Sequence, residues 1–265
     1  SRKPEDILSE IKQLAKEGYK EITLLGQNVN SYNGGENYKF ANLLRDVDKI
    51  EGIERIRFVS PHPKDFTDDV IDAIADSKKI SRLLHVPLQS GSTDVLKVMN
   101  RKYTKEQYLS LIDRIKTKIQ DVVFSTDIIV GFPGETEENF EDTLDVVRKV
   151  DFEQIFMFIY SRRVGTVADR MENQIPEEIK HKRFNRLKDL YEENIEKNNE
   201  KYVGTNQKIL VEGYSKNNEK MLTGRTDTNK VVIFEGNEDL IGKTINIKIV
   251  SQHRWYLKGD SRDCP

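Results

Sequence analysis

The chain has 265 residues, with 43 lysines and arginines against 45 aspartates and glutamates, a net charge of −2. This balance excludes a uniformly basic nucleic-acid coat protein but permits a local basic face. No apolar run approaches the ~18 residues that a membrane span needs, and no secretory signal is present. The only cysteine, Cys264, cannot form an internal disulfide, which favours a reducing, cytoplasmic location.

The first two thirds of the chain alternate apolar runs with amphipathic segments, beginning with a helix that carries Ile7, Ile11 and Leu14 on one face. Strands are predicted at residues 21–25, 55–59, 83–88, 122–130 and 154–160. Such alternation predicts a parallel sheet with right-handed crossovers. Each strand ends in a polar loop with glycine or serine, so a partial (β/α) barrel is favoured over a doubly wound sheet. Neither a G-x-G-x-x-G nor a G-x-x-x-x-G-K-[ST] motif is present.

A long helix is predicted over Glu177–Lys201, with an apolar stripe that includes Ile179, Leu187 and Tyr191. The hydrophobic period then changes to two. Five short strands are predicted at residues 208–211, 221–225, 231–234, 245–250 and 255–257. We therefore expect an α/β domain over residues 1–200 and a small all-β, OB-like barrel over residues 201–265.

The predicted barrel loops carry amide, hydroxyl and glycine residues instead of an acid–base set. Amides and hydroxyls both donate and accept hydrogen bonds, which suits a small molecule with ribose and amino-acid groups. For Gly131–Gly134 the alternative, a tight strand-to-helix turn without a ligand, is equally open. The loop residues in question are Gly26, Gln27, Asn28, Ser60, Gln89, Ser90 and Gly131.

The four histidines are scattered and do not have metal-ligand spacing. His62 lies between two prolines, where orienting a loop is a more common role than catalysis, and His85 is expected in the core or lining the barrel. In the predicted small barrel, Arg225, Lys230, Arg254 and Trp255 lie on or beside strands, where they could pair with phosphates and stack on a base. A solvated β-surface with a core tryptophan explains them equally well.

Several segments together resemble the radical-SAM tRNA methylthiotransferases, in order and over nearly the whole chain. The tail from Lys201 to about Asp260 resembles the TRAM RNA-binding domain of that family. The segments are Glu21–Tyr32 (EITLLGQNVNSY), Arg55–Phe66 (RIRFVSPHPKDF), His85–Thr104 (HVPLQSGSTDVLKVMNRKYT), Ser125–Glu135 (STDIIVGFPGE) and Phe158–Val167 (FIYSRRVGTV).

The resemblance implies an enzyme that adds a methylthio group to C2 of N6-isopentenyladenosine, beside the anticodon of tRNA. In that family, S-adenosylmethionine and two [4Fe–4S] clusters carry the chemistry. Cysteine thiolates hold such clusters, and this sequence has only Cys264. We therefore expect the chain to be a piece of a longer protein, to hold no cluster and to be inactive by itself. The expected partner is the tRNA anticodon stem-loop, and no binding to a membrane is expected.

The resemblance also implies roles for particular residues around S-adenosylmethionine. Near the methionine amine would lie the residues after the first strand, Gly26, Gln27 and Asn28. Near the ribose would lie Gln89 and Ser90, after the third strand, and near the adenine would lie Asp127, Ile129 and Gly131, on and after the fourth. Ser60, at the end of the second strand, is a further candidate.

Two other functions stay open on the sequence. One is a methylthiotransferase for threonylcarbamoyladenosine in tRNA or for a ribosomal-protein aspartate. The other is an RNA-binding module without catalysis, which the single cysteine favours.

Overall fold

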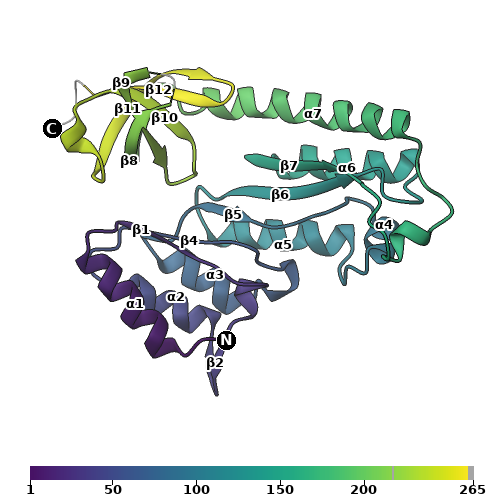
Figure 1. The fold of residues 1–265 in the computed structure, drawn as a ribbon, viewed down its shortest axis with the longest axis horizontal. Helices are drawn as coiled ribbons and strands as arrows, with labels where there is room; N and C mark the ends of the chain where they lie inside the picture. The colour runs from purple at the N-terminus through teal and green to yellow at the C-terminus, as the bar shows by residue number, and fades with distance from the viewer. Residues whose placement is uncertain (217, 262–265) are drawn as a thin grey trace.

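A computed structural model gives the fold of residues 1–216 and 218–261 (Figure 1). An open arc of parallel strands and helices is followed by the long helix α7, which reaches from the arc to a small β-barrel. The helices are α1 (Pro4–Lys16), α2 (Phe40–Asp48), α3 (Asp68–Asp76), α4 (Thr93–Val98), α5 (Lys105–Lys118), α6 (Glu137–Val150) and α7 (Glu177–Glu200), with short 3-10 turns η1 (Val29–Ser31), η2 (Pro63–Asp65), η3 (Ala168–Arg170) and η4 (Glu238–Leu240). The strands are β1 (Glu21–Leu24), β2 (Asn33–Gly35), β3 (Tyr38–Lys39), β4 (Arg55–Phe58), β5 (Leu83–His85), β6 (Val123–Val130), β7 (Gln154–Ile159), β8 (Asn206–Ser215), β9 (Asn218–Thr226), β10 (Val231–Glu235), β11 (Thr244–His253) and β12 (Tyr256–Asp260).

The arc confirms the predicted partial barrel. β1 pairs in parallel with β4, and β5, β6 and β7 form a second parallel set. The two sets meet where the Ile56 N–H donates to the Lys79 carbonyl and the Ser81 N–H donates to the Ile56 carbonyl, both at 2.9 Å. Among the described residues, β1 and β7 have no second partner strand, so the barrel is open.

Helices cover only the outer face of the arc. Strand residues that point outward, such as Ile56, Leu84 and Phe124, are fully buried against α2, α3, α5 and α6, which contact one another in chain order. Thr104 and Thr136 are the N-caps of α5 and α6, and both form complete capping boxes. Within residues 1–216 and 218–261, no helix covers the inner face in the same way.

Helix α7 differs from the predicted apolar stripe at its start. Leu187 and Tyr191 are buried on the arc as expected, but Ile179 is exposed and Lys180 and Arg183 are buried instead. Lys180 and Arg183 bind polar groups of the arc, as described below. A hydrophobicity pattern does not predict such contacts.

The small barrel is closed, in the order β10-β12-β11-β8-β9, as the OB-like prediction requires. All pairs are antiparallel except β10 with β12. Its core is a separate cluster of apolar side chains: Ile209, Val211, Leu222, Val232, Phe234, Ile247, Ile249 and Leu257. No helix within residues 1–216 and 218–261 is both long and apolar enough to cross a bilayer.

The β9–β10 turn of the small barrel, residues 226–230, docks at the amino-terminal ends of the arc strands. The Ser81 hydroxyl donates to the Asp227 carbonyl at 2.7 Å, and the Arg82 N–H donates to the Asp227 carboxylate at 3.0 Å. One residue of the turn therefore satisfies polar groups at the start of β5.

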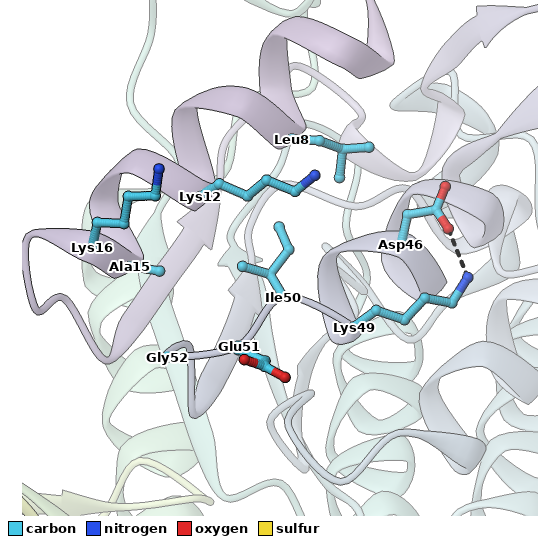
Figure 2. A pocket seen from close by; sticks show the side chains of 9 residues that line it. All are labelled: Leu8, Lys12, Ala15, Lys16, Asp46, Lys49, Ile50, Glu51 and Gly52. Carbon is cyan, nitrogen blue, oxygen red and sulfur yellow. Dashed lines mark hydrogen bonds and ion pairs between the residues drawn. The ribbon is translucent and has the colours of Figure 1, made fainter.

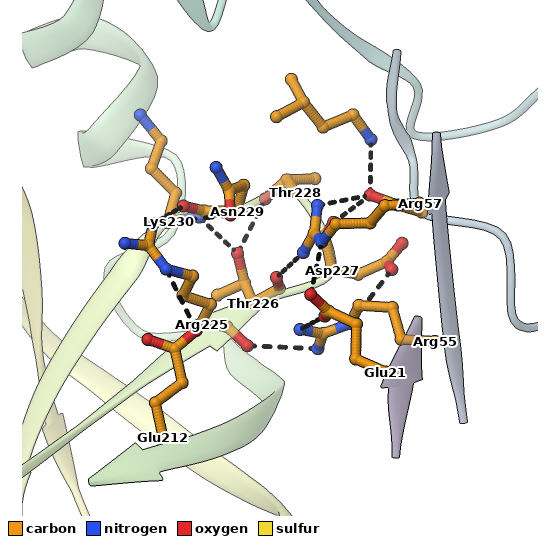
Figure 3. A network of polar contacts seen from close by, with 12 residues as sticks. Glu21, Arg55, Arg57, Glu212, Arg225, Thr226, Asp227, Thr228, Asn229 and Lys230 are labelled. Atoms are coloured by element: carbon orange, nitrogen blue, oxygen red, sulfur yellow. Dashed lines mark hydrogen bonds and ion pairs between the residues drawn. The ribbon is translucent and has the colours of Figure 1, made fainter. Parts of the chain in front are cut away.

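Two arginines of β4 continue this junction (Figure 3). Arg55 donates to the Arg225 carbonyl at 3.1 Å, and Arg57 donates to the Thr226 carbonyl at 3.4 Å. Both arginines also pair with Glu21 of β1, at 3.2 and 3.1 Å. Because the guanidinium groups are largely buried, Glu21 offsets charge that would otherwise be costly to desolvate.

We predict that Asp227→Ala weakens the junction, because the Arg82 N–H and the Arg55 guanidinium lose their shared acceptor. Loss of such an acceptor costs about 1–3 kcal/mol of unfolding free energy, measurable by urea denaturation. Asp239→Ala, which removes an exposed aspartate of η4, should change stability by less than about 0.5 kcal/mol. Equal effects of the two substitutions would contradict this account of the turn.

Candidate functional site

The loops after β1 and β4 are joined at the carboxyl end of the arc. The Val29 N–H donates to the Ser60 carbonyl at 3.2 Å, and the Asn30 amide exchanges two hydrogen bonds with the His62 backbone, at 2.8 and 2.9 Å. Ser60 has a φ of 57°, in the left-handed region. His62 therefore orients a loop, as expected from its neighbouring prolines.

The predicted residues Gly26, Gln27 and Asn28 lie in this loop pair and are exposed. They do not line the cavities described below, whereas Ser60 does. Their assignment to the methionine end of a ligand stays a prediction.

Gln89 and β6 are joined backbone to backbone. The Gln89 N–H donates to the Asp127 carbonyl at 2.8 Å, and the Ile129 N–H donates to the Gln89 carbonyl at 2.9 Å. Gln89 adopts a φ of 69° at this point. The three predicted residues consequently line one cavity. Ser90 instead is fully buried and faces Thr143 of α6.

The turn after β6 is held by a buried ion pair. The Gly131 N–H donates to the Glu135 carboxylate at 2.9 Å, and Arg183 of α7 pairs with the same carboxylate at 2.9 Å. Burial raises the pKa of Glu135, while the Gly131 N–H and Arg183 act in the opposite direction. Gly131 has a φ of 74°, and a Cβ there would lie 2.4 Å from the side chain of Lys180. Glycine is therefore required for the turn and for the seating of α7.

Two adjoining cavities open on the uncovered inner face. The larger, about 990 Å³, lies at the carboxyl ends of β6 and β7, and the smaller, about 390 Å³, lies deeper along the strands. Asp127 and Phe158 line both. Several large apolar side chains that remain exposed lie here, among them Phe158 (51% exposed) and Val167 (83%). Concave apolar surface with a few convergent polar groups is typical of a ligand site.

His85 joins this site, although the sequence left open whether it belongs to the core. Its Nδ1 lies 3.0 Å from the Ser125 hydroxyl, and its Nε2 lies 3.3 Å from an Asp127 carboxylate oxygen. His85, Ser125 and Asp127 line the smaller cavity, with Phe156 edge-on to the imidazole at 6.0 Å. The period of two along β6 places residues 125, 127 and 129 on one face, which is the signal that could have identified the cluster.

The four predicted RNA-binding residues line one cleft of about 180 Å³ between α7 and the small barrel. The two arginines are paired with carboxylates: Arg225 with Glu212 at 3.1 Å, and Arg254 with Glu192 and Glu196 at 3.0 and 2.7 Å. Trp255 is 63% exposed, so it is not a core residue.

Lys230 has an acidic partner that the sequence did not indicate. Its ammonium group is buried and forms an ion pair with Glu153, the residue before β7. Burial lowers the pKa of Lys230 to about 8, and Asp151 partly opposes this shift. Its charge is paired at the junction, as those of Arg225 and Arg254 are, and its assignment to an RNA phosphate stays a prediction. Sequence alone could not show that the residue before β7 supplies its partner.

A third cavity, a groove of about 690 Å³ between α1 and the end of α2, lies apart from the inner face (Figure 2). Lys12 and Lys16 border its apolar floor, and Lys49 pairs with Asp46 at 2.9 Å. None of the predicted site residues lies in it.

The donor groups of the arc fit S-adenosylmethionine but not an iron–sulfur cluster. Gln89 and Asp127 offer an amide and a carboxylate to the larger cavity. By contrast, residues 1–216 and 218–261 contain no group of three histidine, cysteine, aspartate or glutamate side chains that could hold a metal. Cys264 lies outside the described residues.

An open parallel barrel, with polar loops at the carboxyl ends of its strands and a closed β-barrel behind it, defines the class of fold. The sequence profile of the Radical SAM superfamily matches residues 1–147, and that of the TRAM domain matches residues 200–261. The chain belongs to the Radical SAM superfamily and carries a TRAM domain, which confirms the family prediction.

Curated relatives give a finer comparison. The chain is 58% identical to tRNA-2-methylthio-N(6)-dimethylallyladenosine synthase of Clostridium beijerinckii, over 98% of this chain and 58% of that protein. It is 52% identical to the synthase of the same name from Acetivibrio thermocellus, over 98% of this chain and 54% of that protein. The chain thus spans little more than half the length of these relatives.

Solved structures show the fold. Coproporphyrinogen III oxidase (HemN) from Escherichia coli, a radical SAM enzyme, matches with a TM-score of 0.54 at 12% identity, over 94% of this chain and 60% of that one. The radical S-adenosylmethionine methyltransferase TsrM from Kitasatospora setae matches with a TM-score of 0.50 at 18% identity, over 62% of this chain and 32% of that one.

We predict that Lys230→Met destabilises the protein by about 3–5 kcal/mol, because it leaves Glu153 buried without its counter-charge. The double variant Lys230→Met/Glu153→Gln should recover part of this loss in a urea-denaturation cycle. Lys243→Met, at an exposed position, is the matched control. A double variant less stable than Lys230→Met would contradict the assigned ion pair.

Proposed function

We propose that this chain is the barrel and RNA-binding part of a tRNA methylthiotransferase. The complete enzyme would add a methylthio group to C2 of N6-isopentenyladenosine beside the anticodon, with S-adenosylmethionine and two [4Fe–4S] clusters. The observation that carries the proposal is 52–58% identity, over 98% of this chain, to relatives named for that product. A cytoplasmic location, the anticodon stem-loop as partner and a domain boundary after residue 200 belong to the same proposal.

The residues on the inner face suit the methyl donor. S-adenosylmethionine, when bound, would supply the methyl group. The Gln89 amide and the Asp127 carboxylate would hold its hydroxyl or amine groups, and Ile129 would contact its adenine. Exposed apolar side chains around them would be covered by the ligand, which would exclude water from the cavity.

The chain supplies no thiolate set for a cluster, since its sequence contains one cysteine. Cluster ligands would therefore have to come from outside these 265 residues, and the isolated chain is expected to be inactive. For the isolated chain, this same observation favours a second function, RNA binding without chemistry.

The test uses a complete protein that contains this chain, reconstituted and incubated with tRNA bearing N6-isopentenyladenosine. Mass spectrometry of the digested nucleosides should detect the 2-methylthio product. Asp127→Asn should lower its formation by about 10- to 100-fold, because a hydrogen bond to a charged group is lost. Asp239→Asn, on the small barrel, is the control. Product on threonylcarbamoyladenosine alone, or undiminished product with Asp127→Asn, would contradict the proposal.

A further inference from the structure

Among the described residues, Asp127 is the only carboxylate that lines both cavities of the inner face. Within residues 1–216 and 218–261 its side chain has a single hydrogen-bond partner, the His85 imidazole, whose Nε2 lies 3.3 Å from Oδ2. The terminal torsion of an aspartate is only weakly restrained by itself, so a carboxylate without a partner samples a broad range of directions. The direction of the Asp127 carboxylate therefore depends on His85.

His85 is itself fixed by the two strands beside it. In the parallel pairing of β5 with β6 it lies opposite Ser125, and its Nδ1 is 3.0 Å from the Ser125 hydroxyl. From β7, Phe156 packs edge-on against the imidazole, with 6.0 Å between ring centroids. Only 19% of the His85 side chain is exposed. The ring thus has little freedom to turn, and it can hold a neighbouring group in one orientation.

The chemistry of the three polar groups sets the direction of their hydrogen bonds. A carboxylate can only accept, so Nε2 of His85 carries the proton that is donated to Asp127. In the neutral ring Nδ1 has no proton, and it accepts one hydrogen bond from the Ser125 hydroxyl. Each group of the array therefore donates to the next, from Ser125 through His85 to Asp127.

A serine, a histidine and an aspartate also form the nucleophilic array of many hydrolases, in which the serine faces the substrate. Here the aspartate is the member nearest to the larger cavity: Asp127 lines both cavities, whereas Ser125 and His85 line only the smaller one. Ser125 is also only 3% exposed. The array is therefore arranged to orient a carboxylate and not to present a nucleophilic hydroxyl.

We propose that His85 is the positioning residue for Asp127. It holds Oδ2 of the carboxylate and leaves Oδ1 for a hydroxyl or amine of S-adenosylmethionine in the larger cavity. This inference rests on the proposed function, which assigns Asp127 to that ligand. Because His85 acts through Asp127 and does not touch the ligand, its removal should matter only while the carboxylate is present.

The first test measures equilibrium binding of radiolabelled S-adenosylmethionine by dialysis, with a complete, reconstituted protein that contains this chain. His85→Leu removes the donor but keeps an apolar side chain beside Phe156, and it should weaken binding by about 3- to 10-fold, the effect of one lost hydrogen bond. His85→Gln, whose amide nitrogen can replace Nε2, should recover most of the affinity. His181→Leu, at an exposed position of α7, is the matched control and should bind like the wild type.

A double-mutant cycle separates positioning from a general structural effect. In a protein that carries Asp127→Ala, His85→Leu should weaken binding no further, because no carboxylate remains to be oriented. An equal loss with and without the carboxylate would overturn the proposal, and so would wild-type affinity of His85→Leu. In both cases a weakened Asp127→Ala would leave the proposed function standing. Wild-type affinity of Asp127→Ala would instead contradict the role that the proposed function gives to Asp127.

A second test needs neither ligand nor cluster. In ¹⁵N NMR spectra of the histidine-labelled chain at mildly alkaline pH, the His85 ring should be the tautomer protonated at Nε2, with its signals assigned from His85→Gln. Asp127→Ala should shift the His85 Nε2 signal and leave the His181 signals unchanged. A His85 ring protonated at Nδ1, or one that does not respond to Asp127→Ala, would overturn the proposal whatever the outcome of the binding experiment.

Discussion

The two faces of the parallel strands in the arc are buried to different extents, and the candidate site depends on this difference. Such strands are ordinarily covered on both faces, but here helices α2, α3, α5 and α6 cover only the outer one. Phe156, Phe158 and Val59 therefore remain partly exposed on the inner side. This surface is the candidate site: it has apolar walls, and His85 and Asp127 are polar groups that line its smaller cavity.

The position of the small barrel is fixed relative to that surface by polar contacts instead of a shared apolar core. The two core clusters are separate. Between them lie the Arg55–Glu21–Arg57 group, the Asp227 turn and the buried Lys230–Glu153 pair. Hydrogen bonds and ion pairs have strict geometry. RNA held by the barrel would therefore meet the inner face in a defined orientation.

Local sequence signals predicted most of the fold, because the hydrophobic period of a segment depends on its own secondary structure and on which of its faces is buried. The alternation of apolar runs with amphipathic segments predicted the parallel arc, and the change of hydrophobic period separated the arc from the small barrel. The local signals did not show interactions between residues distant in sequence. The ion pair of Lys230 with Glu153, the residue before β7, was not predicted. Ile179 was expected on the buried stripe of α7 but is exposed, whereas Arg183 is buried in an ion pair with Glu135. That the buried Tyr160 hydroxyl has no hydrogen-bond partner among the described residues likewise becomes evident only in three dimensions.

The central claim, that the inner face and the small barrel act on one RNA, is tested most directly by hydrogen exchange. The chain would be measured with and without a stem-loop that carries N6-isopentenyladenosine in its loop. We predict slowed exchange both in β8–β12 and in the cavity segments 98–101 and 160–168. Slowed exchange confined to the small barrel would contradict the claim, because the RNA would then bind without reaching the inner face.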